Sequence, residues 1–288
     1  ERSLSKTMKQ NKRKLILWLA LIVVLAVASV LTGGAGGETE SVQEVMRDAV
    51  LHETGRISLF GIRDVNPGLV SAYVVTVVLL VLAVCLRLFA VPRFRDVPGK
   101  LQMLLELWVS TFSGMAEKNS PHRNKVLGPY LFGAGTYIFV STLFELLGVQ
   151  AVTTAGHSVA LPAPLSDVNG AIAMGVLSYL FILSGGVSAV GLRGVGRTLK
   201  EFSLPISMSF RLFGALLSGL LVTELVYFYI TLSFVLPVIV GVMFTLLHAL
   251  IQSYVLTMLV ALYYGEVSEP VHPKASKQAN NDTQAIAA

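Results

Sequence analysis

The stretch from Leu204 to Tyr264 reads LPISMSFRLFGALLSGLLVTELVYFYITLSFVLPVIVGVMFTLLHALIQSYVLTMLVALYY. An α-helix needs about 20 apolar residues to cross the roughly 30 Å hydrocarbon core of a bilayer, since unpaired backbone polar groups cannot be left in lipid. This stretch has about three times that length, so at a rise of about 1.5 Å per residue it can supply two long or tilted helices. We divide it near Tyr229 to Pro237, which predicts a helical hairpin.

Four further apolar runs meet the same length criterion. They are Leu15–Leu31, Leu69–Leu88, Val126–Val149 and Ala171–Val190. The 288-residue chain is 54% hydrophobic and 14% charged, with a mean hydropathy of +0.70, whereas about a quarter of the residues of a soluble domain are charged. The sequence therefore predicts an all-α integral membrane protein, with about five to six transmembrane helices in one bundle.

Lys and Arg cluster on one side of the predicted spans. The basic segments are residues 1–14, 93–125 and 193–200, whereas residues 150–166 contain neither Lys nor Arg. The positive-inside rule places the basic segments in the cytoplasm. The net charge of +5 therefore reflects membrane orientation, and no nucleic-acid partner is expected.

The predicted organisation has four parts. Residues 1–33 form a basic N-terminus with an extra helix, residues 34–67 an external segment, residues 68–265 the helical bundle, and residues 266–288 a polar cytoplasmic tail. The first apolar run also has the features of a cleaved signal peptide, and both readings stay open. If the helix is retained, both termini are cytoplasmic.

The segment Leu101–Met115 differs from the apolar runs. Its apolar residues, among them Leu104, Trp108 and Phe112, recur at helical spacing, while polar residues fall mostly elsewhere around the helix. This pattern predicts an amphipathic intracellular helix. The helix can lie along the membrane face, or it can pack on the bundle as a cytoplasmic helix.

Four ionisable residues lie inside the apolar runs: Arg211, Glu224, His248 and Glu145. Inserting a charge at mid-bilayer costs about 2.5 to 3.5 kcal/mol, so each of these residues is expected to have a functional or structural role. Arg211 stays protonated and cannot relay a proton by titrating, but it can hold a positive potential in lipid. The alternative is that it pairs with a carboxylate on a neighbouring helix and only fixes the geometry of the bundle.

The other three residues can titrate. A carboxyl group in a low-dielectric environment favours its neutral form, so Glu145 and Glu224 can bind and release protons near neutral pH, as can the imidazole of His248. Each also has a simpler reading. The two glutamates lie near helix ends and can meet water, and a buried histidine is commonly a hydrogen-bonded core residue.

The predicted hairpin brings distant polar residues to one depth. Antiparallel folding about a bend near residue 232 places Arg211 level with Gln252 and Ser253. Gln252 can hydrogen-bond the guanidinium without neutralising it, which leaves the positive charge available. A buried arginine without an internal counter-ion implies a carboxylate supplied by a partner.

Four sequence elements resemble the subunit a family of F-type ATP synthases. They are SMSFRLFG at residues 207–214, QSYVLTMLVALY at residues 252–263, PGKLQ at residues 98–102 with Glu106, and SDVN at residues 166–169. The resemblance spans about residues 60–266. The Arg-Leu-Phe-Gly element within a long terminal hairpin is highly specific in combination with the others.

The resemblance implies a stator subunit whose terminal hairpin faces a rotating ring of c subunits, each with one essential carboxyl group. Arg211 matches the essential arginine of the family, and Gln252 matches its partner. A ring carboxyl group loses its proton to one half-channel near Arg211 and is reprotonated from the other before it enters lipid. Proton translocation is thereby coupled to ATP synthesis elsewhere, so the chain itself is expected to be non-catalytic.

The same resemblance implies further residues and partners. The half-channel candidates are Glu145, Glu224, His248, Asp167, Asn169 and Ser207. The expected partners are c-ring subunits, b-type peripheral stalk subunits, the remaining ATP synthase complex and membrane lipids. No cofactor or metal is expected, and the implied location is the bacterial plasma membrane.

Three positions depart from the family pattern. Ala215 stands where Asn is usual, Leu220 where an acidic residue is usual, and Thr245 where a titratable residue is common. Glu224 lies one helical turn after Leu220 and shares roughly its face, so it can substitute for the missing acid. His248 lies three positions after Thr245. We therefore expect an outer half-channel with a different arrangement of titratable groups.

Two other functional classes share some of these sequence features. A self-contained transporter or channel also explains intramembrane charges, but such folds tend to contain internal repeats, and the Arg211 region has no second copy. An intramembrane enzyme could use Glu and His as acid and base. The chain lacks an HExxH motif, a GxSxG motif and a P-loop, so none of these motifs supports this class. Its one cysteine, Cys85, excludes an internal disulfide.

Overall fold

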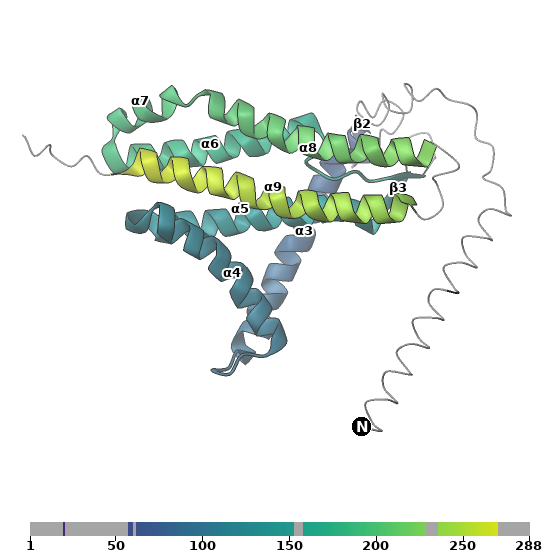
Figure 1. The fold of residues 1–288 in the computed structure, drawn as a ribbon, viewed down its shortest axis with the longest axis horizontal. Helices are drawn as coiled ribbons and strands as arrows, with labels where there is room; N and C mark the ends of the chain where they lie inside the picture. Colours follow the sequence, from purple (N-terminus) through teal and green to yellow (C-terminus); the bar gives the residue numbers. More distant parts are fainter. Residues whose placement is uncertain (1–19, 21–56, 60–61, 153–157, 229–235, 270–288) are drawn as a thin grey trace, which may run out of the picture. The chain divides into compact units, whose positions relative to one another are not determined.

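The computed structural model describes residue 20 and residues 57–59, 62–152, 158–228 and 236–269 (Figure 1). The helices and strands are β1 (Ile57–Leu59), β2 (Ile62–Val65), α3 (Pro67–Cys85), η1 (Leu86–Ala90), η2 (Val91–Arg93), α4 (Lys100–Asn119), η3 (Pro121–Arg123), α5 (Asn124–Phe144), η4 (Glu145–Leu147), β3 (Gln150–Val152), β4 (Ser158–Ala160), α6 (Val168–Val190), α7 (Leu192–Lys200), α8 (Ser203–Phe228) and α9 (Leu236–Ser268). The predicted first run, Leu15–Leu31, lies outside the described residues apart from residue 20, and the tail after residue 269 lies outside them entirely.

Four described helices are long and apolar enough to cross a membrane. They are Pro67–Arg93, Pro121–Leu147, Val168–Ala189 and Gly241–Ser268. The number rises to five if α7 and α8, which meet at a bend of 48°, form one span. The all-α integral membrane fold is therefore confirmed. The predicted division of the last apolar stretch near Tyr229 to Pro237 lies mostly outside the described residues, which stop at Phe228 in α8 and resume at Leu236 in α9.

Contacts divide the chain into two compact units. The first unit comprises Glu1–Tyr73, Ser141–Asp167 and Phe213–Ala249. The second unit comprises Val74–Val140, Val168–Leu212 and Leu250–Ala288. Helices α3, α5, α8 and α9 each contribute residues to both units.

A stack of three aromatic rings ties α5, α6 and α9 together in the second unit. The rings of Tyr130 and Phe181 are parallel with centroids 3.8 Å apart, and the rings of Phe181 and Tyr264 lie 5.0 Å apart. The Tyr130 hydroxyl donates to Ser178 Oγ at 3.0 Å, so its polar group is satisfied inside the bundle. Helices in lipid associate through such close packing and hydrogen bonds.

Glycines allow α7 to fold back along α6 (Figure 1). Gly191, at φ +66°, makes the turn between the two helices in a conformation that favours glycine. A Cβ atom at Gly194 would lie 2.0 Å from the carbonyl oxygen of Gly186. The backbones of α6 and α7 can approach this closely because Gly186 and Gly194 both lack a side chain.

Helix α4 confirms the predicted amphipathic helix, and its two halves have different surroundings. In its second half, Phe112 is buried and the indole N–H of Trp108 donates to Thr136 Oγ1 on α5 at 2.9 Å. In its first half, Leu101 and Leu104 are exposed. The second half of α4 therefore packs on the bundle, as one of the two alternatives predicted. The exposed apolar side chains of the first half fit the other alternative, a helix that lies along the membrane face.

In the first unit, the start of α3 is held by Asn66. Its side-chain oxygen accepts from the backbone N–H of Gly68 at 2.7 Å, which satisfies one of the free donors of the first helical turn. Pro67 occupies the first helical position, where its missing N–H has no consequence.

Two short hairpins, β1–β2 and β3–β4, also belong to the first unit. The sequence did not indicate these hairpins, because strands of three and four residues carry too little periodicity.

Candidate functional site

Helix α8 presents a buried apolar stripe on one side and Arg211 on another. Leu204, Met208, Leu212 and Leu216 recur every four residues and are all buried, as expected for one face of an α-helix. Arg211 lies off this stripe, and its side chain is exposed. Among the described side chains, no carboxylate pairs with its guanidinium.

Gln252 on α9 contacts the backbone of Arg211. Its side-chain amide donates to the Arg211 carbonyl oxygen at 3.2 Å, and the residue is 5% exposed. Its Oε1 atom is buried and has no hydrogen-bond partner among the described residues. The sequence suggested a bond from Gln252 to the guanidinium. The structure brings the two residues together through the backbone carbonyl instead, so the charged group is not engaged by this bond.

The rotation of α9 about its axis is fixed by the neighbouring residue. Ser253 is buried, and its hydroxyl donates to the Gly135 carbonyl oxygen on α5 at 2.8 Å. Adjacent residues of a helix point about 100° apart. Anchoring Ser253 to α5 therefore directs Gln252 toward α8.

The position of α8 is fixed by a close approach to α6. A Cβ atom at Gly175 would lie 2.3 Å from Ser209 Oγ and 2.8 Å from the carbonyl oxygen of Pro205. Ser209 Oγ itself donates to that carbonyl at 2.7 Å. The glycine of α6 thus admits the face of α8 that carries Ser209, and Arg211 lies two residues further along, off this face. The sequence alone did not indicate Gly175, since one glycine in an apolar run carries no signal of its own.

Two predicted polar residues of the second unit are exposed. Ser207 lies one helical turn before Arg211 on α8 and shares its side of the helix. Asn169 lies in the first turn of α6. No hydrogen bond from either side chain to Arg211 occurs among the described residues.

Asp167 accepts a hydrogen bond from Asn66 in the first unit. The Asn66 side-chain amide donates to Asp167 Oδ1 at 3.2 Å, and a Cβ atom at Gly68 would lie 2.9 Å from Asp167 Cβ. Asn66 therefore links the start of α3 to the residue before α6. The sequence alone did not indicate Asn66, because the two residues are 101 positions apart.

The titratable candidates of the first unit lie on three elements. Glu145 is half-buried in η4, and His248 is half-buried in α9. Glu224 belongs to α8, but its side chain lies outside the described residues. The structure therefore places the backbone of Glu224 on α8 and leaves its proposed role untested.

Gly219 of α8 makes room for the imidazole of His248. A Cβ atom at Gly219 would lie 3.1 Å from Nδ1 of His248. On the other side, the ring of Phe244 has its centroid 5.9 Å from that of His248. The sequence alone did not indicate Gly219, because the register that sets Arg211 level with Gln252 places Gly219 level with Phe244, one helical turn from His248.

The arrangement around Arg211 can present a permanent positive charge within an apolar helix. An arginine stays charged under physiological conditions and offers five N–H donors in a planar fork that matches a carboxylate. The exposed guanidinium can therefore bind and orient a carboxylate, but Arg211 cannot itself relay a proton, because it stays protonated.

Comparison with known proteins gives a consistent family. The family model described as ATP synthase A chain matches residues 70–265, about two thirds of the chain. Two similar curated relatives are named ATP synthase subunit a and come from Cereibacter sphaeroides strains ATCC 17025 / ATH 2.4.3 and ATCC 17029 / ATH 2.4.9. Each is 25% identical over 231 residues, covering 76% of this chain and 86% of the relative.

Proposed function

The chain belongs to the ATP synthase A chain family, and we propose that Arg211 is the fixed cation past which carboxyl groups of a partner ring move. As a family member the chain is a multi-pass membrane subunit of the synthase, and it serves proton translocation in the membrane sector. Family membership leaves no support for the alternative of a self-contained transporter. The roles of individual residues are our proposal.

One observation carries the assignment of Arg211. Its side chain is exposed on an apolar helix, and no carboxylate of the described residues pairs with it. A charge inside the bilayer costs about 2.5 to 3.5 kcal/mol, so a sequence without a use for it would be more stable with an apolar residue. A carboxylate that arrives from outside this chain offsets that cost. Subunits of a c-ring, each with one essential carboxyl group, are the partners we propose.

The proposed mechanism follows from electrostatics. A carboxyl group beside Arg211 is favoured in its ionised form and gives its proton to water in one half-channel. Once it has moved past the cation, it must be reprotonated from the second half-channel before it meets lipid, where a bare carboxylate is too costly. The fixed positive charge also opposes direct proton flow between the two half-channels. Each proton that crosses 100 mV supplies about 2.3 kcal/mol.

Gln252 is proposed as the residue that positions the guanidinium. The hydrogen bond that its Nε2 donates to the Arg211 carbonyl oxygen holds α8 and α9 together. Its Oε1, which has no partner among the described residues, can accept an N–H from the Arg211 side chain when a ring is present. A neutral amide can do this without cancelling the charge. A glutamate at the same position would cancel it.

The remaining polar candidates are proposed to conduct protons along the half-channels. Glu145, Asp167 and His248 are half-buried in the first unit, and with Glu224 we assign them to the outer half-channel. Partial burial leaves each group able to meet water and still exchange protons. Ser207 and Asn169, both exposed, are proposed as polar lining groups without a proton of their own to exchange.

The wider assembly is also part of the proposal. The chain is non-catalytic, and its partners beyond the c-ring are b-type peripheral stalk subunits and the remaining synthase. The basic ends of the spans place those ends in the cytoplasm by the positive-inside rule. The membrane is a bacterial plasma membrane, and both termini are cytoplasmic if the first apolar run is retained as a helix.

The test is the substitution Arg211→Ala in the assembled synthase, measured as ATP synthesis in sealed, energised vesicles. We expect synthesis to be lost while the complex still assembles, because only the ionisation of the passing carboxyl group is removed. Arg211→Lys, which keeps the charge but loses the planar fork, should retain little of the rate. The matched control is Arg87→Ala, which removes an exposed arginine near the end of a span, where it can snorkel to water. Synthesis at the normal rate in Arg211→Ala would refute the assignment.

A further inference from the structure

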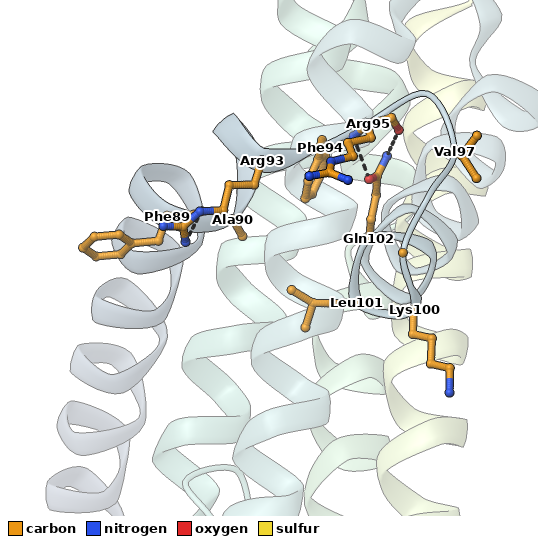
Figure 2. Close-up of a pocket in the computed structure, with 10 residues that line it drawn as sticks. Phe89, Ala90, Arg93, Phe94, Arg95, Val97, Lys100, Leu101 and Gln102 are labelled. Carbon is orange, nitrogen blue, oxygen red and sulfur yellow. Dashed lines mark hydrogen bonds between the residues drawn. The ribbon is translucent and has the colours of Figure 1, made fainter.

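A pocket of about 560 Å³ lies where the first described span ends and α4 begins (Figure 2). Its lining includes three cations, Arg93, Arg95 and Lys100, together with the aromatic ring of Phe89 and the apolar side chain of Leu101. All belong to a short stretch of the second unit. The pocket thus combines a cluster of positive charge with apolar walls.

Hydrogen bonds hold the frame of the pocket (Figure 2). The backbone N–H of Arg95 donates to Gln102 Oε1 at 3.0 Å, and Gln102 Nε2 donates back to the Arg95 carbonyl at 2.9 Å. The same amide nitrogen donates to Glu106 Oε1 at 2.8 Å. Arg95 and the first turn of α4 are therefore held in a fixed relation, and the carboxylate of Glu106 is held by Gln102.

The three cations have few interactions with the described part of the chain. The Arg93 guanidinium donates to the Phe89 carbonyl at 3.2 Å, which leaves most of its donors free. Among the described residues, no carboxylate pairs with Arg93, Arg95 or Lys100. The three side chains point in different directions (Figure 2), but their positive charges add at the pocket, so an anion there is favoured by the combined field.

The apolar walls distinguish a lipid from a free ion. Phe89 is 60% exposed, Leu101 59% and Val97 85%, and all three line the pocket. The span Pro67–Arg93 that leads into it carries exposed apolar side chains along its length. A small anion gains nothing from such walls, whereas the acyl chains of an amphiphile bury against them. Basic pockets between helices at the membrane surface suit anionic lipid headgroups.

We infer that this pocket binds the phosphate headgroup of an anionic phospholipid at the membrane surface. The guanidinium groups of Arg93 and Arg95 can each meet phosphate oxygens through paired N–H donors, while Lys100 adds a third charge. The acyl chains lie along Phe89 and the exposed face of α3. Arg211 plays no part in this site. The bound lipid contacts both α3 and α4 where the two helices join.

The experiment uses the purified full chain and native mass spectrometry with added phosphatidylglycerol or phosphatidylcholine. We expect the chain to retain phosphatidylglycerol in preference to phosphatidylcholine. Each basic residue near an anionic headgroup changes the affinity about fivefold, so Arg95→Gln should weaken binding about fivefold. The triple variant Arg93→Gln, Arg95→Gln and Lys100→Gln should weaken it about a hundredfold.

A matched triple variant serves as the control. Lys118→Gln, Lys125→Gln and Lys200→Gln remove the same net charge from exposed positions of the same unit, and none of the three lysines lines the pocket. This variant should bind phosphatidylglycerol as the unchanged chain does. Circular dichroism of each variant reports whether the helices persist.

Three results would overturn the inference. Equal weakening by both triple variants would mean that general surface charge, and not the pocket, attracts the lipid. Displacement of phosphatidylglycerol by equimolar inorganic phosphate would assign the pocket to a free ion. Unchanged lipid binding in the pocket variant, with loss of a stalk subunit from the purified synthase, would assign it to a protein partner.

Discussion

We expect Gln252→Leu to stabilise the isolated chain while it slows proton translocation in the assembled synthase. The substitution nearly preserves the volume of a side chain that is 5% exposed. It removes one hydrogen bond, from Nε2 to the Arg211 carbonyl. It also removes the buried Oε1, which has no partner among the described residues.

The magnitudes favour a net gain in stability. A hydrogen bond between membrane helices contributes about 0.6 kcal/mol on average. The Arg211 carbonyl oxygen keeps its backbone hydrogen bond within α8, so removing the bond from Gln252 leaves no unpaired polar group there. Relief of a buried unpaired acceptor is worth about 1 to 3 kcal/mol. The free energy of unfolding should therefore rise by about 1 to 2 kcal/mol, which raises Tm by about 2 to 8 °C.

Activity should change in the opposite direction. If Oε1 accepts an N–H from the Arg211 guanidinium in the complex, that bond to a charged group contributes about 1.5 to 3 kcal/mol. Its loss should slow ATP-driven proton pumping in sealed vesicles about tenfold or more. Gln252→Glu should slow pumping further, since its carboxylate pairs with Arg211 and cancels the charge. A lower Tm for Gln252→Leu, together with unchanged pumping, would refute both the unpaired state of Oε1 and its proposed use.

Two further substitutions test the packing that positions the site. A Cβ atom at Gly135 would lie 2.3 Å from Phe112 Cε1, so Gly135→Ala should lower the free energy of unfolding by about 1 to 3 kcal/mol in thermal denaturation. Gly133→Ala, with nothing within 4 Å of its Cβ position, should have little effect, and equal losses at the two sites would contradict the close contact. Gly194→Ala forces a methyl group against the backbone oxygen of Gly186, so hydrogen exchange of α7 should accelerate; unchanged exchange would show that the two helices do not approach each other this closely.

The spans and the terminal hairpin could be predicted from the sequence because the signal is long and uniform. Lipid requires about 20 apolar residues per crossing, and Leu69–Leu88 and Ala171–Val190 satisfy this without ambiguity. That the last apolar stretch supplies two helices, described as α8 and α9, follows from its total length. The proximity of Arg211 and Gln252 then follows from antiparallel register alone, since residues equidistant from a bend lie at one depth.

The contacts within the site could not be predicted, because they depend on how each helix is rotated. The bond from Gln252 to a backbone carbonyl, instead of the guanidinium, depends on Ser253 being anchored to Gly135. The closeness of α6 and α8 depends on Gly175, whose role is visible only when the opposing helix is in place. Sequence periodicity indicates which face of a helix is buried, but it does not indicate which atoms of the neighbouring helix that face contacts.

The two halves of α4 show the same limit. The stripe from Leu101 to Met115 is continuous in sequence, yet Phe112 is buried and Leu101 is exposed. Amphipathic spacing identifies a helix with an apolar side, and it does not distinguish burial against protein from burial against lipid. The pocket at the start of α4 likewise depends on the turn that brings the segment of Arg93 and Arg95 beside the first residues of α4.

The most direct test of the account is a density map of the intact synthase at side-chain resolution, in which the nearest carboxylate to the Arg211 guanidinium is identified. We predict that this carboxylate belongs to a ring subunit and that Gln252 Oε1 lies within hydrogen-bond distance of the same guanidinium. A guanidinium paired with a glutamate or aspartate of its own chain, with no ring subunit facing α8, would contradict the central claim.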